Sequence, residues 1–331
     1  MIKVLVFPTT YICDERCIMC TIPGRESTDL PVDFFERFFS DENLSTLQSI
    51  NLTGGEPTLR KDLDKIVQMI MRHCHQLKEI IINSNGSNPN RVISRVTDVL
   101  KVLDSKVKLW VNISLDALDD KTSDFIRGRK NTATNAKNSL LGLKKLSTNH
   151  SNLEVGINTT ITSQNYNKLR DIFEFAIMND YFLDFSYATV NTAYINSAPL
   201  AHKFVMNQEQ KNEVIEFLKS ISYEKIGSTK HYFNKLIERL EGVKGNRECV
   251  FFDREGVLLE ADGKVRVCGM TEDSYLGDLN SESTKDILNK CTPDLSKNCS
   301  VCETNSYFNW TKTAQEKISQ DMFDSIKLLR S

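Results

Sequence analysis

The chain has 331 residues and a formal net charge of −2, and 40% of the residues are hydrophobic. A chain of this length can bury a sizeable core without disulfides, and its near-neutral charge excludes the broad basic field of a nucleic-acid-binding protein. The densest basic run, Arg127-Gly128-Arg129-Lys130, is short and typical of a solvated face. We expect no membrane span, because no run of about 18 apolar residues occurs. The start of the chain has too few apolar residues for a signal peptide.

Six apolar, β-branched segments alternate with segments of helical periodicity in the first two thirds of the chain. Strands are predicted at residues 3–7, 49–53, 79–83, 108–115, 153–160 and 182–190. Helices are predicted at residues 61–74, 90–103, 133–146 and 166–178. This alternation predicts the α/β class, as a partial (β/α)6 TIM-like barrel that binds ligands at the carboxyl ends of its strands.

The alternation of predicted strands and helices ends near residue 200. Charged helices are predicted at residues 207–220 and 230–240, and a cysteine-rich stretch follows. There, Ala261-Asp262-Gly263 between two apolar runs predicts a β-hairpin. We therefore expect a core domain at 1–200, a helical linker at 201–245, and a small β-hairpin/α domain at 246–331 that closes with a helix over 311–329.

Nine cysteines in a chain that we expect to be cytoplasmic point to metal binding or catalysis rather than to disulfides. Cys13, Cys17 and Cys20 form a C-x3-C-x2-C pattern after the first predicted strand. Three thiolates can hold three irons of a [4Fe–4S] cube and leave the fourth iron open to an amino and carboxylate pair. Structural zinc normally takes four protein ligands, and no fourth Cys or His lies nearby in the sequence.

This cysteine spacing, followed by Gly54-Gly55-Glu56-Pro57, resembles the signature of the radical S-adenosylmethionine (SAM) superfamily. The resemblance implies that SAM is a cofactor and that Gly54, Gly55 and Glu56 hold its methionine amino group. Met19 stands where the family usually has an aromatic residue near adenine, and we interpret it as a tolerated variation because a thioether packs on aromatic rings.

Polar residues at the ends of the later strands match further, weaker elements of the same family. The resemblance implies that Arg127 meets the SAM carboxylate, since a guanidinium can bind a carboxylate through two parallel hydrogen bonds. The remaining candidates for SAM contacts are Asn83, Ser84, Ser114, Asp116, Asn158 and Thr160. Their alternative role is structural, because Ser, Asn and Thr at strand ends commonly cap the following helix.

The C-terminal third contains a second group of cysteines. Cys249 and Cys268 flank Gly263 with the spacing C-x13-G-x4-C, and Cys299 and Cys302 follow as C-x2-C. This order resembles the SPASM/Twitch extension of radical SAM enzymes, which implies an auxiliary [4Fe–4S] cluster with four thiolate ligands. A zinc ribbon is the alternative. Cys291 is a replacement ligand, a hydrogen-atom donor or a small buried residue.

The resemblance implies a radical mechanism. The first cluster passes an electron to SAM, and the resulting 5′-deoxyadenosyl radical abstracts a substrate hydrogen atom. With four cysteines around it, the auxiliary cluster would accept an electron from the substrate radical, so the net reaction would be an oxidation. The family's usual reductant is a flavodoxin or a ferredoxin.

Two classes of substrate compete. A small natural-product intermediate, such as an aminocyclitol or sugar, is favoured over a ribosomally made peptide, because Cys13 leaves little room upstream for a leader-binding domain. A peptide maturase that forms a cross-link or an epimer remains the alternative. An epimerase would use Cys291 as its hydrogen donor. The non-enzyme alternative is a zinc- or cluster-binding module.

Overall fold

The computed structural model describes residues 1–25, 29–190, 192–221, 230–244 and 249–290. Within these residues nine strands form one sheet in the order β6-β5-β4-β3-β2-β1-β7-β8-β9. The strands are β1 (Val4–Thr10), β2 (Ser49–Gly54), β3 (Glu79–Ser84), β4 (Lys108–Ser114), β5 (Leu153–Ile161), β6 (Phe182–Tyr187), β7 (Gly256–Leu259), β8 (Lys264–Arg266) and β9 (Tyr275–Asp278). The predicted residues Cys291, Cys299 and Cys302, and the predicted helix at 311–329, lie outside the described residues.

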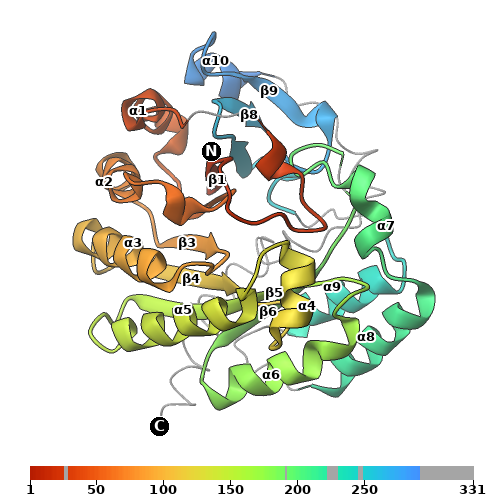
Figure 1. Cartoon of the computed structure of the whole chain (residues 1–331). Coiled ribbons are helices and arrows are strands. Elements are labelled where there is room, and N and C mark those ends of the chain that lie inside the picture. The colour runs from red at the N-terminus through yellow and green to blue at the C-terminus, as the bar shows by residue number, and fades with distance from the viewer. Residues whose placement is uncertain (26–28, 191, 222–229, 245–248, 291–331) are drawn as a thin grey trace.

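Strands β1 to β6 are parallel, and helices follow one another around the outer side of their sheet (Figure 1). The helices are α1 (Val32–Phe39), α2 (Leu63–His73), α3 (Pro89–Val102), α4 (Asp120–Arg127), α5 (Thr132–Ser147), α6 (Leu169–Met178), α7 (Ala201–Phe204), α8 (Gln208–Ser220), α9 (Lys230–Leu240) and α10 (Thr284–Asn289). The predicted partial TIM-like barrel with a C-terminal hairpin is confirmed. The sequence patterns missed the shorter helices α1, α4, α7 and α10, whose one or two turns carry little periodicity.

The two faces of the barrel strands differ in chemistry. Alternate residues of β3 and β4, such as Ile82 and Val111, are fully buried against the helices. On the opposite, inner face, the Asn83 amide donates to Asn51 (2.8 Å), and the Asn112 amide donates to Asn83 (3.2 Å). The inner face therefore carries polar side chains, whereas the core of the protein lies between the strands and the outer helices.

The inner face is also concave. Trp110 on β4 and Phe182 on β6 meet edge to face with ring centroids 4.9 Å apart, although β5 lies between their strands. Gly156 on β5 is paired with both Asn112 and Phe182, and a Cβ atom there would lie 2.5 Å from the Asn112 Oδ1. A glycine at this position leaves space for side chains from the neighbouring strands to meet across β5.

The C-terminal hairpin continues the barrel sheet instead of forming a sheet of its own. β7 runs parallel to β1, with Val4 opposite Gly256 and Val6 opposite Leu258, and β8 and β9 then pair antiparallel. An ion pair between Lys3 and Glu255 (2.9 Å) adds to this junction. The boundary at residues 245–246 remains a prediction, but the backbone hydrogen bonding is continuous across the two parts.

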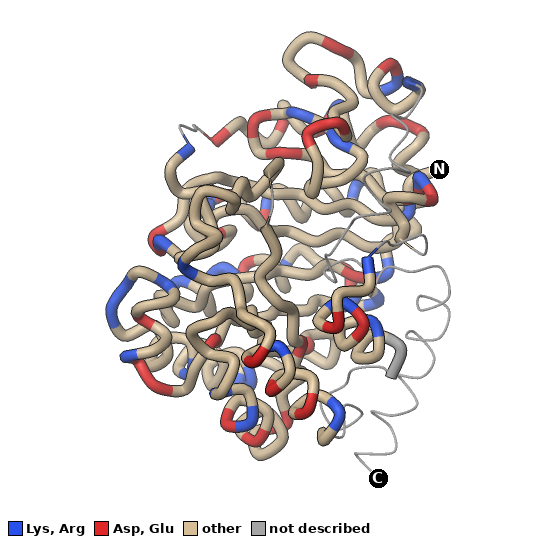
Figure 2. The backbone as a smooth tube through the Cα atoms, turned by 90° about the vertical axis from the view of Figure 1, so that its right-hand side faces the viewer, with Lys and Arg blue, Asp and Glu red and all other residues tan. Residues whose placement is uncertain are grey.

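The sixth strand is shorter than predicted, and it ends at Tyr187. Beyond it the Thr189 carbonyl accepts a hydrogen bond from the Ser197 hydroxyl, so this segment turns instead of pairing further. In the described part of the chain, no helix combines the length and the hydropathy that crossing a membrane requires. Figure 2 shows Lys and Arg positions interspersed with Asp and Glu positions along the backbone.

Candidate functional site

The loop that follows β1 carries the three cysteines of the first group and packs against α4. Within the loop, the Cys20 amide donates to the Cys17 carbonyl (3.1 Å), and all three cysteines are partly exposed. The amides of Arg16 and Ile18 donate to the Arg127 and Ile126 carbonyls at the end of α4, both at 2.9 Å. Figure 1 shows this loop near the carboxyl end of β1, facing α4.

Gly54 and Gly55 bring the Gly-Gly-Glu-Pro turn directly onto this loop. The Gly55 amide donates to the Thr10 carbonyl (2.7 Å), and the Glu56 amide donates to the Ile12 carbonyl (2.8 Å). Gly54 has a φ of 130°, which side chains rarely adopt, and a Cβ atom on Gly55 would lie 2.2 Å from the Ile12 oxygen. The close approach of Thr10 and Ile12 therefore requires glycine at both positions.

Substitution of Gly55 by alanine is expected to destabilise the protein by about 1–3 kcal/mol, because the new methyl group overpacks a backbone contact. Chemical denaturation would measure the loss. Gly24→Ala is the matched control, since a Cβ atom at Gly24 would have no neighbour within 4 Å. Equal stabilities of the two variants would contradict this close packing.

The Glu56 carboxylate is fully buried and joins three segments of the wall behind the cysteine loop. Its Oε1 accepts hydrogen bonds from the Thr58 hydroxyl (2.5 Å) and the Ser84 hydroxyl (2.8 Å), and its Oε2 accepts from the Asn85 amide (2.7 Å). The side chains of Glu56 and Ser84, both predicted to contact SAM, are thus used inside the protein. Their arrangement supports a positioning role.

Asp14, between the first two cysteines, is the centre of a second network. Its carboxylate accepts from the Asn85 amide group (2.8 Å) and the Ser87 hydroxyl (2.8 Å), and it pairs with Arg91 (2.9 Å) and Arg129 (2.8 Å). Burial alone would raise the pKa of Asp14, but these hydrogen bonds and Arg91 lower it overall. The network ties the cysteine loop to α3 and to the segment after α4.

Arg127 forms the third connection. Its guanidinium lies 2.7 Å from the Asp116 carboxylate, 3.7 Å from Glu15 and 3.9 Å from the Cys17 Sγ. Asp116 is fully buried and also accepts from the Thr160 amide (2.9 Å). Arg127 and Asp116, predicted to contact SAM, therefore pair with each other and stabilise the cysteine loop.

Two polar atoms beside Cys17 have no hydrogen-bond partner among the described residues: the Glu15 Oε1 and the Arg127 Nε. Burial raises the pKa of Glu15 to about 7 in spite of Arg127. Buried polar atoms are normally paired, so unpaired ones beside three cysteines are typical of a site that receives a polar group. The sequence patterns did not identify Asp14, Glu15 or Asn85 as site residues. The one signal was the short basic run at 127–130, whose Arg127 and Arg129 pair with Glu15 and Asp14.

The remaining predicted SAM contacts divide into two groups. Met19 packs in a small apolar cluster with Ile18, Ile126 and Phe204. Four others lie on the inner face of the barrel, at or near the carboxyl ends of the strands and partly exposed: Asn83, Ser114, Asn158 and Thr160. Ser114 and Asn158 are directly paired in register. The structure thus brings these four together around the open end of the barrel interior.

The residues around the first cysteine group fit an anionic thiolate site. The Cys13 Sγ accepts from the Glu15 amide (3.5 Å) and the Asn85 amide group (3.8 Å), and the Cys17 Sγ faces the Arg127 guanidinium. Donors of this kind stabilise thiolate sulfur. Burial raises the pKa of Cys13 to about 12, so an iron centre would have to supply the positive charge that holds it as a thiolate. Among the described residues no three Cys, His, Asp or Glu side chains converge as the ligands of a single ion would.

Of the second cysteine group, the structure describes two members. Cys249 is buried before β7, and the Cys268 Sγ after β8 accepts from the Met270 amide (3.4 Å). A buried carboxylate connects this hairpin to the first group: Glu260 accepts from the Tyr11 hydroxyl (2.5 Å) and pairs with Arg25 (3.2 Å) and Arg266 (2.5 Å). Tyr11 and Arg25 flank the cysteine loop, so this loop and the hairpin border one polar cluster.

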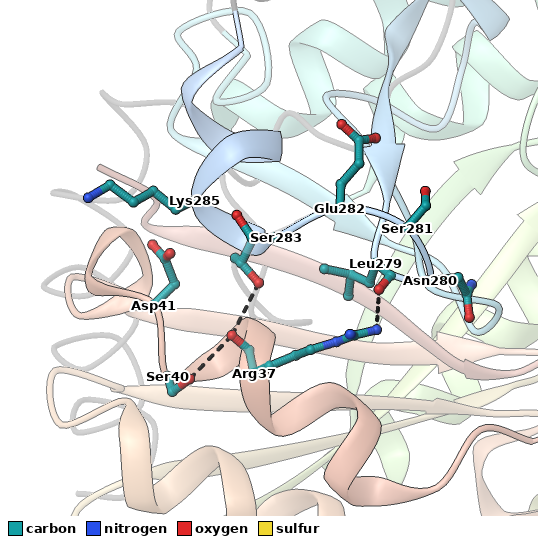
Figure 3. A pocket seen from close by; sticks show the side chains of 10 residues that line it. Arg37, Ser40, Asp41, Leu279, Asn280, Ser281, Glu282, Ser283 and Lys285 are labelled. Atoms are coloured by element: carbon teal, nitrogen blue, oxygen red, sulfur yellow. Dashed lines mark hydrogen bonds between the residues drawn. The ribbon is translucent and has the colours of Figure 1, made fainter.

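A pocket of about 550 Å³ lies elsewhere, between the end of α1 and the turn before α10 (Figure 3). Its walls include Arg37, Asp41, Glu282 and Lys285, and the Arg37 guanidinium donates to the Leu279 carbonyl. None of the candidate site residues lines it. The helices on either side of it, α1 and α10, lie at the top of Figure 1, whereas α4, beside the cysteine loop, lies lower in the view.

Comparisons of sequence found similar proteins that carry the name GTP 3',8-cyclase. A 280-residue alignment with a probable GTP 3',8-cyclase from Saccharolobus islandicus is 22% identical and covers 81% of this chain and 82% of that protein. A GTP 3',8-cyclase from Aquifex aeolicus is 33% identical over 94 residues, and there the match spans only 26% of this chain and 28% of the relative.

Solved structures agree in fold. A structure of anSMEcpe with AdoMet and a peptide bound has a TM-score of 0.65 at 17% identity, over 98% of this chain and 96% of that one. Streptococcus suis SuiB bound to S-adenosylmethionine has a TM-score of 0.62 at 16% identity, over 88% of this chain and 67% of that one. The family model described as Radical SAM superfamily matches residues 7–176, more than half of the chain and the whole region of the first cysteine group. The chain therefore belongs to the radical SAM superfamily.

Proposed function

We propose that this enzyme cleaves SAM reductively, abstracts a hydrogen atom from a small polar natural-product intermediate such as an aminocyclitol or sugar, and oxidises the substrate radical through an auxiliary cluster. The observation that carries the proposal is the cysteine loop itself, which α4, the Gly-Gly-Glu-Pro turn and Asp14 hold at the carboxyl end of β1. When bound to Cys13, Cys17 and Cys20, a [4Fe–4S] cluster supplies the electron that cleaves SAM.

The chain's own residues would bind and orient SAM. The backbone of Gly54 and Gly55 and the inner-face side chains of Asn83, Ser114, Asn158 and Thr160 border the site, and Met19 remains a candidate neighbour of adenine. Glu56, Ser84, Asp116 and Arg127 support the loop from behind. Anaerobic reconstitution with iron and sulfide, reduction with dithionite and addition of SAM should yield 5′-deoxyadenosine. A protein that holds zinc alone and yields no 5′-deoxyadenosine would be the binding module instead.

Oxidation of the substrate radical is proposed to use an auxiliary [4Fe–4S] cluster on Cys249, Cys268, Cys299 and Cys302. Cys268→Ala is expected to leave SAM cleavage largely intact while the yield of oxidised product falls to background, because the electron acceptor is lost. Parallel chromatographic assays of 5′-deoxyadenosine and product would measure both. Cys74→Ala, at a buried position at the end of α2, is the matched control. Unchanged product formation in the Cys268 variant would refute the electron-transfer role.

A redox-neutral epimerisation would instead require a hydrogen donor, for which Cys291 is the candidate. Cys291→Ala would stall an epimerase and leave an oxidase active. A flavodoxin or ferredoxin would serve as the reductant in either case.

A nucleotide substrate is the second candidate, because the relatives that match most of the chain carry the name probable GTP 3',8-cyclase. A triphosphate calls for Arg and Lys side chains around the substrate. From the level of Asn51 towards the carboxyl ends of β2–β6, the inner-face positions hold no Arg or Lys. In a cyclase, loops and the hairpin would have to supply these side chains. Incubation of the reduced enzyme with SAM and GTP decides the matter, since a cyclase would consume GTP.

A peptide substrate is the third candidate, since the solved structures of similar fold include peptide-bound forms of anSMEcpe and SuiB. These similarities are at 16–17% identity and support the fold alone. A precursor-peptide gene beside the gene of this protein would favour this alternative, and a set of sugar-tailoring genes would favour a small molecule.

A further inference from the structure

Asp184 lies in the middle of β6, on the inner face of the barrel and at the level of the last residue of β4. It is paired in register with Asn158 on β5, which in turn is paired with Ser114 on β4. Residues paired in this way across parallel strands point to the same face of a sheet, so these three side chains form one row across the concave surface. Thr160 and Ser186 form the next row towards the open end.

The Asp184 side chain is partly exposed inside the barrel, and its carboxylate has no hydrogen bond or ion pair to any residue that the structure describes. Burial raises the pKa of Asp184 to about 6, so the group is ionised at pH 8. A carboxylate that is poorly solvated and has no protein partner is costly, and such groups are typical of binding and catalytic sites.

The surroundings of Asp184 on the barrel strands are polar but uncharged. From the level of Asn83 and Asn112 towards the carboxyl ends of β2 to β6, the other inner-face positions hold only neutral side chains. The two inner-face glutamates, Glu79 and Glu154, lie at the opposite ends of their strands, where Glu79 accepts from Ser49 (2.8 Å) and Glu154 pairs with Lys108 (3.3 Å). On β2 to β6, Asp184 is therefore the one ionisable inner-face group from the level of Asn83 and Asn112 to the carboxyl ends of the strands.

The neutral neighbours suit a ligand with several hydroxyl groups. Asn83, Asn112 and Asn158 offer amide donors and acceptors, and Ser114, Thr160 and Ser186 offer hydroxyls, all on one concave surface above the aromatic pair Trp110–Phe182. A carboxylate among such groups favours a ligand that brings its own positive charge, because that charge compensates the poorly solvated anion.

We propose that Asp184 is the substrate-binding residue that receives the ammonium group of a polyhydroxylated amine. The inference rests on the proposed function and makes it more specific: the substrate is an amine-bearing cyclitol or sugar, and its ammonium group fixes which carbon faces SAM. Neutral sugars and phosphorylated nucleotides bind less well, because the first leaves the carboxylate uncompensated and the second places negative charge against it.

The test uses SAM-loaded, unreduced holoenzyme at pH 8 and two probes that differ in one group: scyllo-inosamine, which carries an amine, and scyllo-inositol, which carries a hydroxyl in its place. Equilibrium dialysis with labelled probes should show that wild-type enzyme prefers the amine by roughly tenfold or more, since hydrogen bonds between charged groups are the stronger ones. Asp184→Asn should reduce this ratio to near one. Ser186→Ala is the control, because it removes a hydroxyl but no charge from the same face. It should affect the two probes alike and keep the preference for the amine.

Thermal unfolding gives a second readout that does not depend on a probe. Asp184→Asn should raise the Tm at pH 8, because a neutral amide avoids the cost of a poorly solvated charge without a partner. A lower Tm in this variant would show that the carboxylate stabilises the barrel and would overturn the proposal. So would a wild-type enzyme without preference for the amine, or a preference that survives Asp184→Asn. Formation of 5′-deoxyadenosine by the reduced wild-type enzyme is scored separately, so failure of the radical function and failure of the amine site are distinguished.

Discussion

Cys17→Ala is expected to abolish SAM cleavage. Cys17 lies between the other two cysteines of the loop, and its sulfur faces the Arg127 guanidinium and Glu15. Without it only two thiolates remain, which are too few to hold a cube with a single open iron. After anaerobic reconstitution, the variant should contain little iron and sulfide, lack the cluster's visible absorbance, and form no 5′-deoxyadenosine above background.

The same result is expected for Cys13→Ala and Cys20→Ala, whereas Cys74→Ala should behave as the wild type. Cys74 is a fully buried residue that ends α2, and it has no place in the site. Circular dichroism would confirm that each variant is folded, so that loss of activity reports on the cluster. If a folded Cys17 variant still cleaved SAM, the assignment of the three cysteines would be refuted.

The fold was largely predictable because parallel strands buried on one face have a clear sequence pattern. Segments such as 79–83, with three successive isoleucines, are typical of buried strands, and the segments between them have helical periodicity. The placement of the hairpin was not predictable. Pairing of Val4 with Gly256 joins residues about 250 positions apart, and local periodicity carries no information about such contacts.

The candidate site was predictable only in part. Cysteine spacing and the Gly-Gly-Glu-Pro turn identify the loop and its neighbour, because both are local motifs. The side chains that support the loop come from separate strands and helices: Asp14 meets Arg91 and Arg129, and Glu15 meets Arg127. Several predicted ligand contacts, among them Glu56 and Asp116, prove to be members of these networks. Whether a strand-end carboxylate faces a ligand or the wall depends on the tertiary packing around it.

Arg127→Leu is expected to destabilise the protein by about 3–5 kcal/mol, the range for removing one partner of a buried ion pair. The Arg127 side chain is 10% exposed, and Asp116 and Glu15 are at most 1% exposed. Burial alone would lower the pKa of Arg127, but the negative groups around it raise it overall, so the guanidinium remains charged. Its removal leaves two carboxyl groups buried without a cation. Urea denaturation would measure the loss, and SAM cleavage should fall because Cys17 loses its positive neighbour.

A double substitution separates electrostatics from packing. Asp116→Asn added to Arg127→Leu removes a buried charge and keeps an oxygen that can accept from the Thr160 amide, so it should recover part of the lost stability. Arg129→Leu is the matched control: its partner Asp14 retains Arg91, and the expected loss is within about 1 kcal/mol. If Arg127→Leu cost no more than Arg129→Leu, the pair with Asp116 would not hold α4 to the loop. A variant with intact stability and weakened SAM binding would return Arg127 to the role of a direct ligand contact.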